Sequence, residues 1–461
     1  MSIHKLQQWK KEELDTISPS FCAAKWQQVT VHLQNGHTHS CHHPSTHKIP
    51  LDEIKDNPSA LHNTKFKKEQ RRLMLAGERP KECGYCWKVE DEGSGTLSDR
   101  VFKSADLWAR PHIKDIVSKP WDDNVIPSYL EISFGNVCNF KCSYCNPAVS
   151  SQWMEEIQHF GPYPTSDNFN NIEHLKRVEQ MPIPNNQENP YVDAFWEWWP
   201  TIADKVEVFR ITGGEPLLNK NTYKILDYLI ENPKPNLQLN INANMCPPPD
   251  LLDKFIEKIK IIHNEKKVNT VRIFTSAEAY GEAAEYIRHG MNYTTWINNI
   301  ERVFQEVPGI IFGVMSTYNA LSVTTYKQFL EDMVRLKTKY YTPEHYTVAP
   351  MIVDIPYLRW PNHQNVFILT QDFAPLIKEQ VDYMIANTET PENRIMPFSE
   401  TETERMKRIY EMFINGNASD QTAHRRNFKI FVDEHDRRRG TDFLSTFPTM
   451  TDFYNSCGEK Q

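Results

Sequence analysis

The stretch from Tyr129 to Asn146, YLEISFGNVCNFKCSYCN, predicts a short strand followed by a loop that carries three cysteines. Residues 130–134 alternate apolar and polar side chains, and Gly135-Asn136 is a turn pair that ends the strand. The three cysteines have C-x3-C-x2-C spacing and are Cys138, Cys142 and Cys145. Thiolates are ligands of zinc and of iron-sulfur clusters, and a closed site normally has four. Three cysteines on a cluster therefore leave one iron open to a small molecule.

A glycine-rich motif follows the next predicted strand, residues 206–211. It reads Thr212-Gly213-Gly214-Glu215-Pro216. Two glycines allow a backbone to approach a ligand closely, and the Glu215 carboxylate can accept a hydrogen bond from a cationic amine. Taken alone, the same residues could form an ordinary glycine turn.

Predicted helices and strands alternate after this motif. The strands are expected at 237–243, 271–275, 310–316 and 346–353, and the helices between them at 223–231, 251–262 and 326–337. This alternation is typical of parallel strands joined by crossover helices, in which functional residues follow the carboxyl ends of the strands. The polar residues at such ends are Asn242 and Asn244 after the third strand, and Ser276 and Glu278 after the fourth. Each of them could equally be a helix cap or a surface group.

Together these motifs resemble the radical S-adenosylmethionine (SAM) superfamily, including Tyr144, an aromatic residue just before the last cysteine. The resemblance covers residues 126–356 and implies an α/β fold with a partial (β/α)6 TIM-type barrel. It also implies a [4Fe-4S] cluster on the three cysteines, with the open iron chelated by the amino and carboxylate groups of SAM. One-electron reduction of SAM would then give a 5'-deoxyadenosyl radical. A zinc knuckle, or three unrelated core thiols, is the alternative for these cysteines.

The same resemblance implies which residues contact SAM. Glu215 would bind the amine of the methionine moiety, and the strand-end residues would hold the ribose and methionine. Arg288 and Gly290 match a downstream Arg-x-Gly pattern, whereas Glu278 replaces the aspartate of the family pattern. The full set of expected SAM contacts is Tyr144, Gly213, Gly214, Glu215, Asn242, Ser276, Glu278 and Arg288. The sequence assigns no catalytic acid, base or hydrogen-atom donor.

Four further cysteines lie near the N-terminus. Residues 29–33 alternate like a strand, Asn35-Gly36 predicts a hairpin turn, and the spacing from Cys22 through Gly36 to Cys41 is C-x13-G-x4-C. That pattern resembles the auxiliary-cluster modules called SPASM and twitch, and Cys83 and Cys86 supply two more thiols at C-x2-C. Four cysteines suffice for a second, closed [4Fe-4S] cluster. A zinc site is the alternative, because His37, His39, His42, His43 and His47 are nearby. With four thiols available, these histidines are expected to be solvent-facing loop residues.

Composition limits the class of protein. The chain has 461 residues, nine cysteines and a formal net charge of −8, which argues against a nucleic-acid partner. It has no run of about 18 apolar residues and no exported-type leader, which predicts a soluble cytoplasmic protein without a membrane partner. Iron-sulfur chemistry fits such a reducing compartment. The expected partners are SAM, an electron donor such as flavodoxin or ferredoxin, and a peptide or protein as one class of substrate.

Three domains are expected: an auxiliary-cluster module at 1–100, the radical SAM core at 126–356, and a C-terminal helical extension at 357–461. Residues 91–126 are interpreted as a polar linker, and 161–200 as an insertion rich in tryptophan over the barrel mouth. The extension is predicted to have helices at 372–387 and 399–415, and a basic run at 435–440. This run is interpreted as a solvated helix face, and binding of an anionic substrate by its arginines is the alternative.

The sequence thus predicts an enzyme that cleaves SAM reductively and abstracts a hydrogen atom from an unidentified substrate, such as a peptide or protein. One alternative is a radical SAM enzyme that acts on a nucleoside or sugar. The other is a non-catalytic iron-sulfur or zinc binding protein on the same scaffold.

Overall fold

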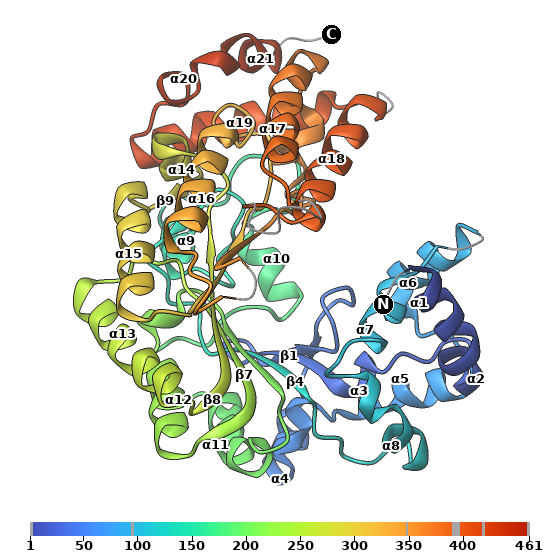
Figure 1. Ribbon diagram of the computed structural model, residues 1–461. Coiled ribbons are helices and arrows are strands. Elements are labelled where there is room, and N and C mark those ends of the chain that lie inside the picture. The colour runs from blue at the N-terminus through green and yellow to red at the C-terminus, as the bar shows by residue number, and fades with distance from the viewer. Residues whose placement is uncertain (1–2, 94–95, 347–348, 390–396, 417–419, 459–461) are drawn as a thin grey trace. The chain divides into compact units, whose positions relative to one another are not determined.

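The computed structural model describes residues 3–93, 96–346, 349–389, 397–416 and 420–458 (Figure 1). The fold is α/β with a mostly parallel central sheet, consistent with the partial TIM-type barrel that the sequence predicts. The chain forms two compact units. The first contains Met1–Gly135, Glu179–Asn240 and Lys266–Thr270, and the second contains Asn136–Val178, Ile241–Glu265 and Val271–Gln461.

The first unit contains three parallel strands side by side: β1 (Gln28–His32), β4 (Tyr129–Ser133) and β6 (Val208–Thr212). Leu130 and Ile132 of β4 are fully buried, as the alternation predicts, and each contributes on the order of 1.5–3 kcal/mol by leaving water. β7 (Lys234–Asn242) follows β6 in the strand order. β2 (His37–His39) and β3 (His47–Lys48) extend the other edge in antiparallel pairing.

The predicted N-terminal hairpin is present, but it is also part of the main sheet. β1 and β2 pair with Thr30 opposite His39, and Gly36 takes a positive φ of 66° in the turn. The other edge of β1 pairs in parallel with β4, with Val29 opposite Leu130 and Val31 opposite Ile132. The local hairpin pattern of the sequence could not reveal this long-range partner.

In the second unit, β10 (Ile311–Met315) lies between β8 (Val268–Ser276) and β11 (Met351–Asp354), and both pairings are parallel. Three helices that accompany these strands have one apolar face: α13 (Pro249–Asn264), α15 (Tyr293–Glu306) and α16 (Tyr326–Tyr340). The predicted strand at 346–353 includes residues 347–348, which lie outside the described part of the chain.

The remaining elements are mostly helical. Those of the N-terminal segment are α1 (Ile3–Trp9), a π-helix (Lys10–Leu14), α2 (Asp15–Ile17), α3 (Ala24–Gln27), α4 (Leu51–Asp56), α5 (Lys65–Leu75), α6 (Gly84–Asp91), α7 (Asp99–Ser104) and α8 (Ile113–Ser118). Those between the strands are α9 (Ser151–Phe160), α10 (Ile172–Arg177), α11 (Pro190–Ile202), α12 (Lys220–Glu231) and α14 (Gly281–Ile287). The C-terminal ones are α17 (Ala374–Ala386), α18 (Glu400–Asn415), α19 (Thr422–Arg439), α20 (Phe443–Thr446) and α21 (Thr451–Ser456).

The predicted linker and the tryptophan-rich insertion both contribute buried side chains. Val101, Trp108 and Ile116, from the predicted linker, are buried in one apolar cluster with Cys83 and Trp87. These residues therefore belong to the N-terminal core. In the tryptophan-rich insertion, Trp198 and Trp199 of α11 are buried, and the Trp199 ring lies 4.5 Å from that of Phe209 on β6. They anchor the helix to the sheet.

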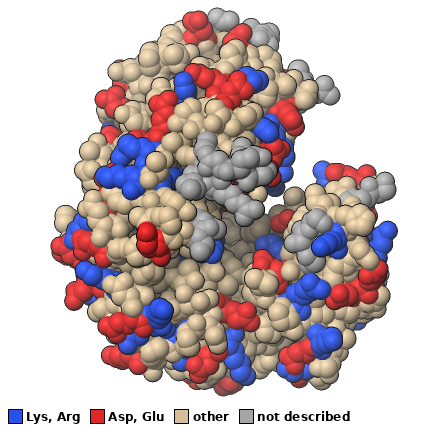
Figure 2. All heavy atoms as spheres, viewed as in Figure 1, with Lys and Arg blue, Asp and Glu red and all other residues tan. Residues whose placement is uncertain are grey.

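The charged surface agrees with the small excess of acidic residues. Figure 2 shows lysine and arginine side chains interspersed with aspartate and glutamate on the face in view, without one sign covering it. Among the described residues, no helix is both long and apolar enough to cross a membrane.

Candidate metal and cofactor sites

The three-cysteine loop is paired with the segment that carries the Arg-x-Gly pattern. β5 (Lys141–Cys142) and β9 (Arg288–His289) form a small antiparallel ladder in which Cys142 is opposite Arg288. Gly290 has a φ of 105°, and a Cβ at this position would lie 2.6 Å from the Asn139 carbonyl oxygen. Only glycine fits this close approach. The sequence pattern thus places Arg288 beside the cysteines.

Arg288 is the centre of a buried polar network in the second unit. Its Nη2 donates to Glu278 Oε2 at 2.6 Å and also to the Tyr144 hydroxyl. Its Nη1 donates to Cys142 Sγ at 3.6 Å. Burial lowers the pKa of the Arg288 guanidinium, but the nearby Glu278 carboxylate raises it by more. The pKa of Arg288 therefore lies above its ordinary value. The expected residues Tyr144, Glu278 and Arg288 are therefore brought together at the loop.

The loop sulfurs fit a metal cluster chemically. Burial raises the pKa of the Cys142 thiol and raises that of Cys145 to about 12, so both hold a proton at neutral pH unless a metal ion replaces it. The Phe140 backbone N–H donates to Cys138 Sγ at 3.4 Å, and the Arg288 guanidinium faces Cys142 Sγ. Such N–H donors compensate thiolate charge and tune the potential of a cluster. Three soft donors on one short loop fit a [4Fe-4S] cluster with one open iron.

Helix α9 and a distant glutamine hold the backbone of the loop. The Trp153 indole donates to the Cys142 carbonyl oxygen at 2.8 Å, and the Cys138 N–H donates to Ser151 Oγ at 3.2 Å. The Ser143 hydroxyl donates to Gln364 Oε1 at 2.7 Å, and Gln364 Nε2 donates back to the Ser143 carbonyl oxygen at 3.0 Å. The pairing of Ser143 with Gln364 has no sequence signal, because the two residues are far apart in the chain.

The basic run on α19 is largely buried, so its interpretation as a solvated face is wrong. Arg439 has no exposed side-chain surface. It donates to the Lys141 carbonyl oxygen at 2.7 Å and to Glu156 Oε2 at 3.0 Å, and its guanidinium lies 4.6 Å from the Trp153 ring centre. Arg438 is buried too, whereas Arg437 is 56% exposed. The C-terminal extension therefore contacts the cysteine loop through the guanidinium of Arg439.

The pKa of the Glu156 carboxyl group reflects its ion pair with Arg439. Burial would raise the pKa of its carboxyl group, but Arg439 first, and then Lys141 and Tyr163, lower it to about 2. The carboxylate accepts from the Tyr163 hydroxyl at 2.8 Å and lies 2.8 Å from Lys141 Nζ. It is therefore ionised and fully bonded at neutral pH.

A second set of bonds joins the loop to the segment after β7. Asn244 Nδ2 donates to Asn139 Oδ1 at 2.7 Å, Asn139 Nδ2 donates to the Cys246 carbonyl oxygen at 2.8 Å, and the Cys246 N–H donates to Asn244 Oδ1 at 2.9 Å. Asn244 thus contacts the loop through the side chain of Asn139. Asn242 and Ser276 are the last residues of β7 and β8, as predicted.

The glycine motif lies at the end of β6 in the first unit. Gly213 has a φ of 129°, and a Cβ there would lie 2.8 Å from the Gly135 carbonyl oxygen and 2.9 Å from Ser133 Oγ. The Gly214 N–H donates to that same carbonyl at 3.1 Å. Glu215 is 2% exposed and accepts from the Leu217 N–H at 2.9 Å. The motif therefore packs against the end of β4, directly before the cysteine loop in sequence.

The four N-terminal cysteines line one small cavity in the first unit, together with Met74 and Trp87. They are Cys22, Cys41, Cys83 and Cys86. Burial raises the pKa of Cys83 to about 12 and that of Cys86 to about 11, and each is raised further by the other cysteines of the set. All four thiols line this one cavity, and Cys22 and Cys41 are near enough to raise the pKa of both Cys83 and Cys86.

Lysine and arginine side chains are buried near the four cysteines, and Lys25 among them lines the cavity itself. Lys25, Lys67 and Arg71 are each at most 2% exposed. Lys25 pairs with Glu82, and its interactions with Cys83 and Cys41 also favour the charged ammonium. Burial first, and then Arg71 and Lys25, lower the pKa of Lys67. Thiolates bound to a metal would add negative charge beside the Lys25 ammonium, and four thiols on one cavity are suitable ligands for a closed four-cysteine cluster or a zinc ion.

The nearby histidines differ in their exposure. His37 and His39 are 3% and 9% exposed and form part of β2, so their prediction as solvent-facing loop residues is wrong. His37 Nε2 lies 3.0 Å from the Glu179 carbonyl oxygen, and His39 Nε2 lies 3.3 Å from His32 Nε2. His42 is exposed, as expected, and His43 is partly buried.

Comparisons with known proteins agree with the geometry of the loop. Residues 132–333 match the model of the radical SAM superfamily, so the chain contains a domain of this superfamily. The chain is 28% identical over 136 residues to a GTP 3',8-cyclase of Campylobacter lari, covering 29% of this chain and 33% of that protein. It is 26% identical over 152 residues to a GTP 3',8-cyclase of Geobacter sulfurreducens, covering 32% and 37%. The match thus spans about a third of the relatives' length.

Solved structures give weaker similarities. The chain aligns with Streptococcus suis SuiB bound to S-adenosylmethionine at a TM-score of 0.35 and 12% identity, covering 78% of this chain and 69% of that chain. It aligns with the FeFe-hydrogenase maturase HydG of Carboxydothermus hydrogenoformans at a TM-score of 0.28 and 13% identity, covering 88% and 96%.

Proposed function

We propose that this chain is a radical SAM enzyme that binds a [4Fe-4S] cluster through Cys138, Cys142 and Cys145. The observation that carries the proposal is the partly buried loop of three cysteines, with the Arg288 guanidinium 3.6 Å from Cys142 Sγ, inside the superfamily domain. When bound and reduced by an external one-electron donor, the cluster would supply the electron that cleaves SAM to methionine and a 5'-deoxyadenosyl radical, which would abstract a hydrogen atom from the substrate. The chain's own residues hold the loop in place.

The residues proposed to bind SAM are those that the family resemblance implies. Glu215, with Gly213 and Gly214, is proposed to bind the ammonium of the methionine moiety, and Asn242 and Ser276 to contact the rest of SAM. Glu278 and Arg288 bond to each other and to Tyr144. This mutual pairing gives them a role in holding the cysteine loop beside any direct contact with SAM.

We further propose that Cys22, Cys41, Cys83 and Cys86 bind a second, auxiliary [4Fe-4S] cluster of the twitch type. Lys25 supports this proposal, because it lines the cavity and its interactions with Cys83 and Cys41 favour the charged ammonium beside the proposed thiolates. An external one-electron donor such as flavodoxin or ferredoxin, and a cytoplasmic location, belong to the same proposal.

The substrate class has two candidates. The relatives by sequence are GTP 3',8-cyclases, and this observation favours a small molecule of the nucleotide class. A peptide or protein is the other candidate, suggested by the resemblance to auxiliary-cluster enzymes. Incubation of the reconstituted enzyme with SAM and either GTP or a peptide mixture would show which one increases SAM consumption.

The experiment that tests the enzyme proposal is anaerobic incubation of reconstituted protein with dithionite and SAM. We expect 5'-deoxyadenosine and methionine, and we expect none from the triple Cys138/Cys142/Cys145→Ala variant. A double Cys246→Ala, Cys457→Ala variant, which keeps both proposed ligand sets, is the matched control and should retain the activity. Wild-type protein that carries its full iron content but forms no 5'-deoxyadenosine would instead support a non-catalytic iron-sulfur protein.

A further inference from the structure

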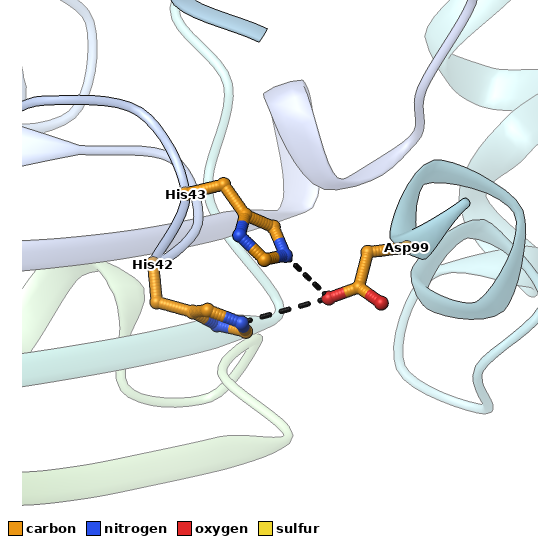
Figure 3. Close-up of side chains that lie close together, drawn as sticks. All are labelled: His42, His43 and Asp99. Atoms are coloured by element: carbon orange, nitrogen blue, oxygen red, sulfur yellow. Dashed lines mark hydrogen bonds and ion pairs between the residues drawn. The ribbon is translucent and has the colours of Figure 1, made fainter. Parts of the chain in front are cut away.

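Beside the four-cysteine cavity, three side chains that belong to neither cysteine set direct their ligand atoms at one point. His42 and His43 follow Cys41, and Asp99 is the first residue of α7. Figure 3 shows both imidazoles directed at the same carboxylate. His43 Nε2 lies 2.6 Å from Asp99 Oδ2 and His42 Nε2 lies 3.5 Å from it. The three ligand atoms all lie within 4.8 Å of one another.

From this geometry we propose that His42, His43 and Asp99 form a binding site for one borderline divalent metal ion of the Zn²⁺ class. The site uses none of the four thiols, although His43 and Asp99 also line the cysteine cavity, and it is independent of the proposed SAM chemistry. Three protein ligands leave at least one coordination position to water or to an exchangeable small ligand, as in open zinc sites. The side chains of His42 and Asp99 are 63% and 34% exposed, so solvent reaches this position.

The distances fit a tetrahedral ion with a small adjustment. Zinc lies about 2.0–2.2 Å from imidazole nitrogen and carboxylate oxygen, so two ligand atoms of a tetrahedral site are about 3.3–3.6 Å apart. The separation of His42 Nε2 from Asp99 Oδ2, 3.5 Å, already has this value. The 2.6 Å contact of His43 is a hydrogen bond, and it would widen by a little under 1 Å when the ion replaces the shared proton.

The surroundings favour this ion over others. The His43 ring is stacked on Tyr85, with centroids 3.8 Å apart and planes at 11°, which fixes the orientation of its Nε2. Hydrogen bonds from His42 and then His43 hold the pKa of Asp99 below its usual range, so the carboxylate is ionised at neutral pH. Two imidazoles select zinc, iron, cobalt or nickel rather than calcium or magnesium. Lys103 contributes an opposing positive charge and limits the affinity.

Binding here would cross-link three segments of the N-terminal core. His42 and His43 lie directly after Cys41, Tyr85 lies between Cys83 and Cys86, and Asp99 begins α7. The loop that carries Cys41 would thereby be fixed to α7. Because the ion binds the folded form, its binding should raise the thermal stability of the chain.

The test is a titration with Co²⁺ as a spectroscopic probe and with Zn²⁺ in competition. Wild-type protein is reconstituted anaerobically, and its iron, sulfide and zinc are measured before the titration. We expect one further equivalent of Co²⁺, with visible d–d absorption but without the sulfur-to-metal charge transfer of a thiolate site, displaced by Zn²⁺. The unfolding temperature should rise as the ion is added.

His42→Ala and Asp99→Asn should each weaken this binding by more than about tenfold, since even residues that only orient metal ligands contribute 10- to 100-fold. Both variants should keep the iron content of wild type, because His42 is exposed and asparagine has the shape of aspartate. His4→Ala and Asp115→Asn, which change exposed residues elsewhere, are the matched controls and should bind as wild type does. Absence of the further equivalent in wild type would overturn the proposal, as would equal binding by His42→Ala and Asp99→Asn.

Discussion

Replacement of Arg439 by alanine should destabilise the folded chain by about 3 kcal/mol, although the residue lies in a basic run near the C-terminus. The change would leave the Glu156 carboxylate, which is 5% exposed, without its main cation. The pKa of Glu156 is about 2 rather than the usual 4.5, and this difference corresponds to about 3 kcal/mol at neutral pH. Breaking a buried ion pair costs about 3–5 kcal/mol in general, which agrees with that figure.

The sign of the pH dependence follows from the same carboxyl group. Its folded-state pKa is lowered, so the stabilisation is fully present above about pH 4.5 and is lost as the pH falls toward 2. A Glu156→Gln variant should lack this part of the acid sensitivity. The predicted loss in Arg439→Ala should therefore be largest at neutral pH and shrink on acidification.

The assay is anaerobic denaturation in guanidinium chloride, followed by tryptophan fluorescence and by loss of the visible absorption of bound iron. Arg437→Ala is the matched control, because Arg437 lies two residues before Arg439 on α19 but is 56% exposed and pairs with Glu434. It should change stability by no more than about 0.5 kcal/mol. The reasoning is refuted if Arg439→Ala unfolds and releases iron at the same denaturant concentrations as Arg437→Ala.

Two further predictions concern the ligand sites. Glu215→Ala should weaken SAM binding by about 1.5–3 kcal/mol without loss of iron, because a charge-assisted hydrogen bond is removed while the thiolates are untouched. Calorimetry checks this, with Glu197→Ala as an exposed control. Unchanged SAM affinity of Glu215→Ala would remove Glu215 from the site. The reconstituted chain should hold about eight irons in two clusters, of which only the one on Cys138, Cys142 and Cys145 changes its paramagnetic resonance signal with SAM. Removal of the four N-terminal cysteines should leave that responsive signal, whereas about four irons and one tightly bound zinc in wild type would favour zinc at the N-terminal site.

The parts of the fold that local pattern determines could be predicted from the sequence. Alternating apolar residues such as Leu130 and Ile132 specify a buried strand wherever that strand pairs, and the observed parallel strands follow from such runs. The sequence contains the Arg288-x-Gly290 pattern that the family resemblance assigns to the SAM site, and the contact of Gly290 with Asn139 shows why only glycine fits there.

The parts that depend on distant partners could not be predicted. Arg439 is charged and lies in a helical run, which normally indicates a solvated face, but its partner Glu156 is 283 residues away in the chain. In the same way, His37 and His39 are polar residues in a short hairpin, and their burial results from pairing and packing that no local pattern reveals. The convergence of Asp99 on His42 and His43 likewise depends on how the predicted linker folds back.

The parallel pairing of β1 with β4 determines where this chain can be cut. Five consecutive residue pairs, from Gln28 opposite Tyr129 to His32 opposite Ser133, satisfy one edge of β4. Deletion of the N-terminal hundred residues would leave these backbone N–H and carbonyl groups unpaired on a strand whose apolar side chains are fully buried. Such an open strand edge pairs with other chains. A shortened protein that starts near residue 126 would accordingly tend to aggregate. The N-terminal segment looks in the sequence like a separate module, but its strand β1 covers an edge of β4 that would otherwise be open.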